Sequence, residues 1–286
     1  MNNPPIIVIG MHRSGTTLVA RILQKSGIFI GNKLDINRES TYFQKINKWL
    51  LSIAGASWDN PDSFDLILNN EVLLTDLIER MKQSFSQFYV SEFLGIQSML
   101  RKRSLYSMSI PWGWKDPRNT FTLPVHLRHF PSAKIIHVFR HGADVAQSLK
   151  IREDRILATG ENQKMLKLKQ LISISIPVIR GGILSSITCQ DRQRAFDLWE
   201  KYMTKAAEYE VNYSKQCLSV RYENLLENPA DMLDNILVFT GTNVSKTEKT
   251  NILSSINKNR AFAYRNDPAL KQFADKNKSI LEKFGY

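Results

Sequence analysis

Two glycines and the residues between them could form a loop that binds a phosphate. Gly10 and Gly15 enclose the sequence Met-His-Arg-Ser, and Thr16 and Thr17 follow. Backbone N–H groups of such a G-x-x-x-x-G loop, together with the N-terminus of a following helix, surround an anion. Loops that bind ATP or GTP continue with Lys and then Ser or Thr, whereas here Thr16 stands in the lysine position. The cation of this loop is Arg13, so the pattern predicts an anion site unlike that of an ordinary nucleoside triphosphatase.

A second candidate anion site follows an apolar run later in the chain. Arg140 comes directly after residues 134–139, and Ser148 stands eight residues further on, in a segment with helical spacing. A guanidinium offers planar bidentate donors and a serine adds a hydroxyl, so the two side chains could bind one phosphate. A strand-end arginine and a helical serine are each common alone, and a solvent-facing pair is the alternative interpretation.

Short apolar runs alternate with segments of helical spacing. The spacing predicts strands at 6–9, 111–117, 134–139 and 217–221. It predicts helices at 17–26, 41–55, 64–88, 120–130, 142–153 and 190–213, with Pro229 opening a further one. This alternation is typical of an α/β fold, with a P-loop-like central parallel sheet flanked by helices, and with helical insertions. We expect residues 1–286 to form a single domain, in which 155–187 is a possible lid or insertion.

The first loop resembles a loop of a known enzyme family. Gly10-Met-His-Arg-Ser-Gly-Thr-Thr-Leu is similar to the 5′-phosphosulfate-binding loop of sulfotransferases that use 3′-phosphoadenosine-5′-phosphosulfate (PAPS), and its Arg-Ser-Gly-Thr core is like that of many bacterial and Golgi members. The resemblance implies that PAPS is the cofactor and that Arg13 contacts its 5′-phosphosulfate. The other loop residues that it implies in donor binding are His12, Ser14, Gly15, Thr16 and Thr17.

Two later segments extend the resemblance. Arg140-x-x-x-Asp-Val-x-x-Ser148 is similar to the family's 3′-phosphate motif, which implies that Arg140 and Ser148 bind the 3′-phosphate that distinguishes PAPS from ATP. Tyr222-Glu-Asn-Leu, followed by Asn-Pro, resembles a family segment in which a tyrosine lies near the adenine. Tyr222 is therefore a candidate nucleotide contact, and packing against the core is the alternative interpretation.

The segment Trp-Lys115-Asp-Pro-Arg resembles a segment of bacterial sulfotransferases in which the lysine faces the transferring group. The resemblance implies that Lys115 and Arg13 stabilise the charge that develops on the leaving phosphate during sulfuryl transfer. No metal is expected, because two cations could do this and the sequence has no metal-ligand cluster.

A general base is also needed to accept the proton of the acceptor. Related bacterial sequences often carry an aromatic–Glu pair after the loop, but here Gln44 occupies the glutamate position and cannot accept that proton. We take the nearby Glu39 as the catalytic base. Asp35, His12 and His141 remain alternatives.

The chain departs from the family pattern in two other places. The C-terminal Arg-Lys-Gly segment of the cytosolic enzymes is missing, and the candidates to replace it are Arg260, Arg265, Lys271 and Lys276. Leu18 stands where those enzymes place a tryptophan. The resemblance therefore implies that stacking on the adenine is arranged differently here.

Composition narrows the class of protein. A hydrophobic fraction of 43% over 286 residues excludes intrinsic disorder for the bulk of the chain. A net charge of +12 favours anionic partners. Two cysteines, Cys189 and Cys217, make neither a disulfide framework nor a zinc site. The apolar stretch 171–179 is too short to span a bilayer and no signal peptide is evident, so we expect a soluble, cytoplasmic protein.

These observations predict a PAPS-dependent sulfotransferase. Its acceptor would be a hydroxyl (or amine) of a glycan, a lipid or a small metabolite, and the lysines of 155–187 allow peripheral contact with an anionic membrane. One alternative is an ATP-dependent phosphotransferase, which the missing loop lysine disfavours and which magnesium dependence would distinguish. Another is a non-enzymatic binder of polyanions or nucleic acid, suggested by the net charge. Nucleic-acid binding is not expected, because the basic residues are spread along the chain without the motif of a known module.

Overall fold

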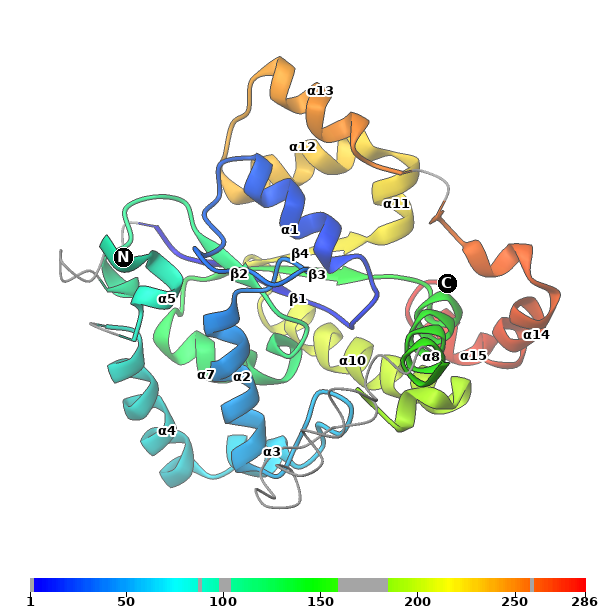
Figure 1. Ribbon diagram of the computed structural model, residues 1–286, viewed down its shortest axis with the longest axis horizontal. Helices are drawn as coiled ribbons and strands as arrows, with labels where there is room; N and C mark the ends of the chain where they lie inside the picture. Colours follow the sequence, from blue (N-terminus) through cyan, green and yellow to red (C-terminus); the bar gives the residue numbers. More distant parts are fainter. Residues whose placement is uncertain (1–2, 87–88, 98–103, 159–184, 258–259) are drawn as a thin grey trace. The chain divides into compact units, whose positions relative to one another are not determined.

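The computed structural model describes residues 3–86, 89–97, 104–158, 185–257 and 260–286 (Figure 1). It divides into two compact units, which we describe separately. The first contains Met1–Arg140 and Tyr202–Ala261, and the second contains His141–Lys201 and Phe262–Tyr286. The assignment of 1–286 to one domain stays a prediction.

The first unit is built on a four-stranded parallel sheet. Its strands are β1 (Ile6–Ile9), β2 (Gly113–Lys115), β3 (Lys134–Phe139) and β4 (Cys217–Arg221), in the order β2-β1-β3-β4. All three pairings are parallel. Every residue of β1 and β2 is buried, which explains the uninterrupted apolar run in β1, because a parallel strand covered on both faces needs apolar side chains on both. The predicted α/β fold with a central parallel sheet is confirmed.

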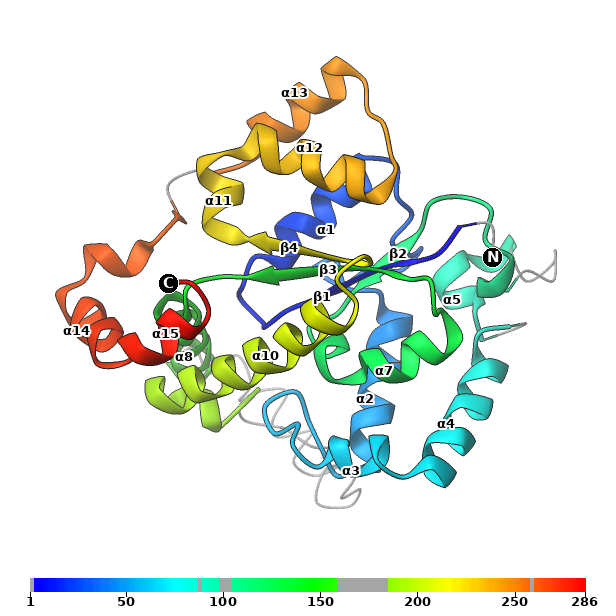
Figure 2. The same ribbon diagram turned by 180° about the vertical axis from the view of Figure 1, so that it is seen from behind.

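Helices cover both faces of this sheet (Figures 1 and 2). On one face lie α1 (Thr16–Lys25), α11 (Tyr222–Glu227), α12 (Pro229–Thr240) and α13 (Lys246–Ser254). They form one apolar core with strand residues that include Val8, Val138 and Val220. On the other face lie α2 (Thr41–Ile53), α7 (Asn119–His129) and the part of α10 (Arg192–Asn212) that follows Tyr202.

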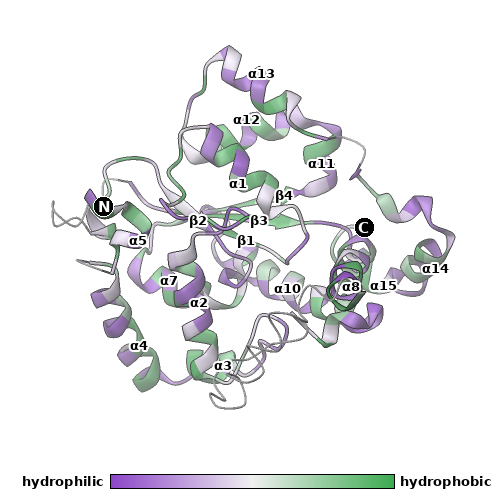
Figure 3. Cartoon of the chain, viewed as in Figure 1, coloured by the Kyte–Doolittle hydropathy of each residue, from purple (hydrophilic) through white to green (hydrophobic). Residues whose placement is uncertain are grey.

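Smaller helices pack outside α2 and α7. They are α3 (Phe64–Leu68), α4 (Glu71–Ser84), α5 (Ser91–Leu94) and the 3₁₀ turn η1 (Leu105–Ser107). Figure 3 shows hydrophilic and hydrophobic residues together along α4, whose buried residues are Leu74, Leu77 and Met81. The sequence predicted one helical stretch over 64–88, but the structure divides it, because the Asn70 side chain accepts a hydrogen bond from the Leu73 N–H (3.1 Å) and so begins α4.

An aromatic core joins α2 to β2. The Phe43 ring stacks on the Trp114 ring with their centroids 3.8 Å apart and their planes nearly parallel. Trp112 packs beside Trp114 at 5.8 Å, and Phe93 meets Phe43 edge to face at 5.2 Å. These four side chains are fully or almost fully buried. Three residues of strand suffice here because the large rings, rather than a long ladder of hydrogen bonds, fix the position of β2.

The second unit is mainly helical. It contains α8 (Gly142–Ala158), the turn η2 (Thr188–Gln190), the first half of α10, the turn η4 (Ala263–Asn266), α14 (Pro268–Lys276) and α15 (Lys278–Lys283). The buried Glu153 accepts hydrogen bonds from the backbone N–H groups of Ser185 (2.9 Å) and Ser186 (3.3 Å). Most of the predicted lid or insertion at 155–187 lies outside the described residues.

Truncation of Phe43 tests the aromatic core. We expect Phe43→Ala to lower the free energy of unfolding by about 3–5 kcal/mol, because it removes a stacked ring and leaves a cavity against Trp114. Urea unfolding followed by tryptophan fluorescence and circular dichroism would measure the change. Ile53→Ala is the matched control, since Ile53 ends the same helix and is 44% exposed. Similar losses in the two variants would contradict this account of the core.

Candidate functional site

Most of the predicted site residues of the first unit lie at one edge of the sheet. Because the four strands are parallel, their carboxyl ends share that edge. The phosphate-loop sequence follows β1, Lys115 ends β2, Arg140 follows β3 and Tyr222 follows β4. In open α/β sheets a ligand binds outside this edge, where neighbouring connections diverge to opposite faces. The topology therefore brings these four parts of the sequence together.

The loop after β1 has the backbone of an anion-binding turn. Gly10, Arg13 and Gly15 have backbone φ values of +133°, +70° and +95°. Residues other than glycine seldom adopt such positive values. The Gly10 N–H donates to the Thr120 hydroxyl (3.0 Å), which fixes the start of the loop. Gly15 is the N-cap of α1 and provides no capping side chain. The first N–H groups of α1 therefore begin without a side-chain acceptor from the cap, as an anion site requires.

The surroundings of this loop fit an anionic group. The Ser14 hydroxyl is fully buried and has no hydrogen-bond partner among the described residues. A Cβ added to Gly15 would lie 2.2 Å from the Tyr222 ring, so any residue other than glycine would clash with that ring. The Arg140 guanidinium lies 5.0 Å from the centroid of the same ring. The Tyr222 ring therefore lies between the loop and Arg140, and its contact with the nucleotide stays a prediction.

A turn that carries Glu39 contacts the start of α1. The Thr17 hydroxyl donates to the Asn37 carbonyl oxygen (3.2 Å). Within the turn, the Glu39 N–H donates to Asp35 Oδ1 (2.7 Å) and the Asp35 N–H donates to the Glu39 carbonyl oxygen (2.9 Å). The Ser40 side chain then caps α2 by accepting from the Phe43 N–H. These bonds hold Glu39 between the phosphate loop and α2.

Glu39 and Lys115 form a buried ion pair. Lys115 Nζ donates to Glu39 Oε1 at 2.8 Å, and the two residues are only 1% and 4% exposed. Lys115 lies beside Val8 in the register of β1 and β2, two residues before the loop begins. The structure therefore brings together two of the three predicted catalytic residues, while Arg13 lies in the neighbouring loop and is exposed.

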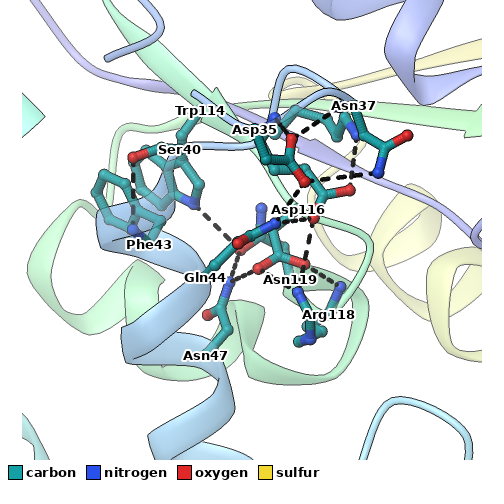
Figure 4. A network of polar contacts seen from close by, with 12 residues as sticks. Asp35, Asn37, Ser40, Phe43, Gln44, Asn47, Trp114, Asp116, Arg118 and Asn119 are labelled. Carbon is teal, nitrogen blue, oxygen red and sulfur yellow. Dashed lines mark hydrogen bonds and ion pairs between the residues drawn. The ribbon is translucent and has the colours of Figure 1, made fainter. Parts of the chain in front are cut away.

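A polar network surrounds this pair, and Figure 4 labels its members Asp35, Gln44, Asp116 and Arg118. Gln44 Nε2 donates to Glu39 Oε2 (2.6 Å) and to Asp35 Oδ2 (2.9 Å). Arg118 donates to both oxygens of Asp116 (2.9 and 3.1 Å) and lies 3.7 Å from Glu39 Oε2. Carboxylates and cations alternate through the network, so each buried charge lies next to an opposite charge or a donor.

The environment of Glu39 favours its protonated form. Burial raises the pKa of the Glu39 carboxyl, and the charge of the nearby Asp116 raises it further, while Lys115 lowers it; the net change is upward. A buried carboxyl with a raised pKa beside a lysine can accept and release a proton nearer to neutral pH than an exposed glutamate can. This is the behaviour expected of a general base.

The alternative bases lie in other surroundings. Asp35 accepts two backbone N–H groups of its own turn, and the His12 ring meets the Trp58 ring edge to face at 4.5 Å. His141 belongs to the second unit, where its buried ring stacks on Tyr264 at 4.0 Å. Asp35 shares the network of Lys115 and Glu39, because Gln44 donates to both Asp35 and Glu39.

Ser148 and most of the C-terminal cations also belong to the second unit. Ser148 lies in α8, so its pairing with Arg140 stays a prediction. Arg265 packs over the Phe262 ring at 4.0 Å, and Lys271 and Lys276 lie in α14. Arg260 belongs to the first unit, where its carbonyl oxygen accepts a hydrogen bond from Arg140 (3.3 Å).

The sequence reasoning missed three polar residues beneath the site. Asn47 donates to Asp116 Oδ2 (3.0 Å) and to Asn119 Oδ1 (2.8 Å), and Asn119 donates to the Val8 carbonyl oxygen (3.1 Å). His126 Nε2 contacts Asn47 Oδ1 at 2.7 Å. Asn47, Asn119 and His126 are fully buried. Asn47 stands at a core-facing position of α2, four residues after Phe43, and a polar residue at such a position was the available signal.

A cavity of about 540 Å³ lies on a different face of α2. It is lined by Tyr42, Ile46 and Trp49 of α2 together with Met81 of α4 and Glu92 of α5. The network side of α2 is formed by Phe43 and Asn47 instead. The cavity is therefore separate from the Lys115–Glu39 pair.

Comparison with known proteins identifies the family. The sequence matches the sulfotransferase family over residues 4–246, and the chain therefore belongs to this family. Two similar solved structures are the sulfotransferase domain of the olefin synthase from Synechococcus PCC 7002 and the sulfotransferase domain from the curacin biosynthetic pathway. Both have 16% sequence identity and a TM-score of 0.51, and they show the shared fold. The matches cover 100% and 96% of this chain, and 96% and 98% of the respective domains. No curated protein matches the sequence.

Metal-ligand clusters and membrane-spanning helices are both absent from the residues that the structure describes. Among them, no three or more His, Cys, Asp or Glu side chains are grouped so that they could hold a metal ion. Within the same residues, no helix combines the length and apolar character needed to cross a membrane.

Substitution of Gly15 tests the contact between the loop and Tyr222. We expect Gly15→Ala to lower the free energy of unfolding more than Gly55→Ala does, by about 1–3 kcal/mol. Both glycines have positive φ, so both variants carry backbone strain, but a Cβ on Gly55 meets nothing within 4 Å. Urea unfolding of the two variants would measure the difference. Equal losses would show that the Tyr222 ring does not confine the loop.

The buried His126 predicts a dependence of stability on pH. Burial, with a smaller contribution from His129, lowers the pKa of His126 to about 3. Between the ordinary pKa of 6.5 and this value, the unfolded chain binds a proton that the folded protein does not, so stability falls as the pH falls. We expect His126→Gln to reduce this slope by about 1.4 kcal/mol per pH unit between pH 6 and 4. Urea midpoints across this range would measure it, and parallel curves for variant and wild type would contradict the assignment.

Proposed function

We propose that this sulfotransferase transfers a sulfuryl group from PAPS to a hydroxyl (or amine) of a glycan, lipid or small-metabolite acceptor. One observation carries the proposal: the buried Lys115–Glu39 pair lies beside the loop after β1. The contact between Thr17 and Asn37 and the register of Val8 with Lys115 support this arrangement. A cation and a proton acceptor at the edge of an anion-binding loop are what sulfuryl transfer between two oxygen atoms requires.

The resemblance to sulfotransferases implies the donor-binding residues, and the fit of the loop after β1 to an anion supports this assignment. Arg13 and the loop residues His12, Ser14, Gly15, Thr16 and Thr17 would hold the 5′-phosphosulfate. Tyr222 would lie near the adenine, and Arg140 with Ser148 would bind the 3′-phosphate. When bound, PAPS supplies an activated sulfuryl group. The buried Ser14 hydroxyl and the Tyr222 ring against Gly15 support a shaped, water-poor subsite.

The catalytic steps use the residues of the ion pair. The Glu39 carboxylate accepts the proton of the acceptor hydroxyl, for which its raised pKa makes it a better base than an exposed glutamate. The Lys115 ammonium and the Arg13 guanidinium stabilise negative charge as it grows on the leaving phosphate. Because Lys115 is buried, its electrostatic effect is stronger than it would be in water.

Membership of the family opposes the other interpretations of the sequence. Thr16 in place of the loop lysine and the match over residues 4–246 both disfavour an ATP-dependent phosphotransferase. The net charge of +12 is accounted for by an anionic donor at least as well as by nucleic acid. Cytoplasmic localisation, a single domain and contact of residues 155–187 with the acceptor or with an anionic membrane belong to this proposal as well.

Donor binding and transfer test the proposal together. Adenosine 3′,5′-bisphosphate should raise the melting temperature more than AMP or ATP, because only the bisphosphate fills both phosphate subsites. A ligand present at one hundred times its Kd raises the free energy of unfolding by about 2.7 kcal/mol. A screen of hydroxyl acceptors with PAPS, read by mass spectrometry, should reveal a sulfated product.

A variant of the ion pair separates binding from chemistry. Lys115→Met should keep the thermal shift with adenosine 3′,5′-bisphosphate and lose the turnover of PAPS. Lys48→Met, which changes an exposed residue of α2, is the control.

Three results would count against the proposal. Equal thermal shifts with AMP and the bisphosphate would exclude a 3′-phosphate subsite. Full turnover in Lys115→Met would remove Lys115 from catalysis. Transfer of phosphate from ATP, dependent on magnesium, would replace the proposed reaction by the phosphotransferase.

A further inference from the structure

The side chain of Gln44 lies between two carboxylates at the start of α2. Its Nε2 atom is 2.6 Å from Glu39 Oε2 and 2.9 Å from Asp35 Oδ2. Figure 4 labels Gln44 and Asp35. An amide nitrogen carries two hydrogens, so both hydrogen bonds can form at the same time. We propose that Gln44 is a positioning residue that fixes the Glu39 carboxylate in the orientation in which it accepts the proton of the acceptor. This inference rests on the proposed role of Glu39 as the base.

The hydrogen bonds of Glu39 show how the carboxylate is held. Oε1 accepts from Lys115 (2.8 Å) and Oε2 accepts from Gln44. With one donor on each oxygen, the carboxylate cannot rotate without breaking a hydrogen bond in a buried site, where an unpaired oxygen is costly. Each carboxylate oxygen has two lone pairs, so one on each oxygen is left over to receive a proton.

The charges around Glu39 explain why a neutral donor is needed at this position. Lys115 of β2, Asp116 and Arg118 of the segment after β2, and Asp35 beyond Gln44 are the charged groups that face it. Burial and Asp116 favour the protonated carboxyl, which cannot act as a base, whereas the hydrogen bonds from Lys115 and Gln44 favour the carboxylate. A carboxylate at position 44 would repel both Glu39 and Asp35. An apolar residue would leave Oε2, among the residues that the structure describes, with only the more distant Arg118.

The position of Gln44 is itself fixed by the start of α2. It lies in the first turn of α2, where its backbone N–H donates to the Ser40 carbonyl oxygen (2.9 Å). The adjacent Phe43 is locked in the aromatic core by its stack on Trp114. The position of the amide is therefore set by the same packing that sets β2 and Lys115.

The experiment compares the titration of Glu39 in wild type, Gln44→Leu, Gln44→Glu and the control Gln83→Leu, which changes an exposed residue of α4. Protein labelled with ¹³C at the glutamate carboxyl is titrated by NMR without ligand, and Glu39→Gln identifies the Glu39 signal. Loss of a hydrogen bond to a charged group should raise the Glu39 pKa by about 1 pH unit or more in Gln44→Leu. Gln44→Glu has nearly the same size but places a third carboxylate beside Glu39 and Asp35, so it should raise the Glu39 pKa as well. Gln83→Leu should not.

The pH profile of sulfuryl transfer completes the test. In Gln44→Leu the acid limb of kcat should move to higher pH by the same amount, with the KM for PAPS unchanged. An unmoved Glu39 titration, or an unmoved acid limb beside a shifted titration, would overturn the inference and leave Gln44 with a structural role only. Failure of the proposed function looks different: Glu39→Gln would keep full turnover, or no variant and no wild-type protein would transfer sulfuryl groups from PAPS.

Discussion

The buried ion pair between Lys115 and Glu39 is the interaction on which the surrounding structure depends. Two charges removed from water are stable only when further donors and opposite charges compensate for the lost hydration. Asp116, Arg118 and Gln44 supply that compensation, and Asn47 holds Asp116 in turn. Since a pair of apolar residues of similar volume would often be as stable, the cost of this arrangement is understandable if the two charges are used in chemistry.

The aromatic rings next to this pair explain why strand β2 can be short. Strand β2 has only three residues, yet it carries Trp114 into the aromatic core and ends on Lys115. A long strand is unnecessary because Phe43 and Trp112 pack around Trp114 and fix its position. Lys115 therefore lies beside β1, close to the start of the loop after β1. The turn that contains Glu39 leads directly into α2, the helix that contains Phe43.

Sequence patterns predicted the strands well because buried strands depend on local chemistry. Buried parallel strands are continuous apolar runs, so the predicted bounds of 134–139 and 217–221 are those of β3 and β4. The division between α3 and α4 was missed, since it depends on one capping asparagine, Asn70, within a pattern that is otherwise helical. Helical periodicity does not reveal such a cap until its hydrogen bond is seen.

The candidate site was predictable in its residue types and less so in its contacts. Lys115 and Glu39 were each chosen from the sequence, but their direct pairing joins positions 76 residues apart and depends on the turn from Asp35 to Glu39. Gln44 was recognised only as a residue unable to act as a base. Its two hydrogen bonds to carboxylates follow from three-dimensional placement and leave no mark on the spacing of the sequence.

The sharing of β2 between the aromatic core and the catalytic edge affects how genetic data on this enzyme should be interpreted. In a saturation mutagenesis screen scored by product formation, substitutions at Phe43, Trp112 and Trp114 would appear as severe as substitutions at Lys115, although these three rings are buried in the core. A parallel screen scored by protein abundance would separate the rings from exposed loop residues such as Arg13, since substitutions of the rings deplete the folded enzyme. Substitutions of Lys115 would lower abundance as well, because they leave the Glu39 charge buried without its cation. Positions that lose product but not abundance would then outline the reacting surface, whichever acceptor the enzyme uses.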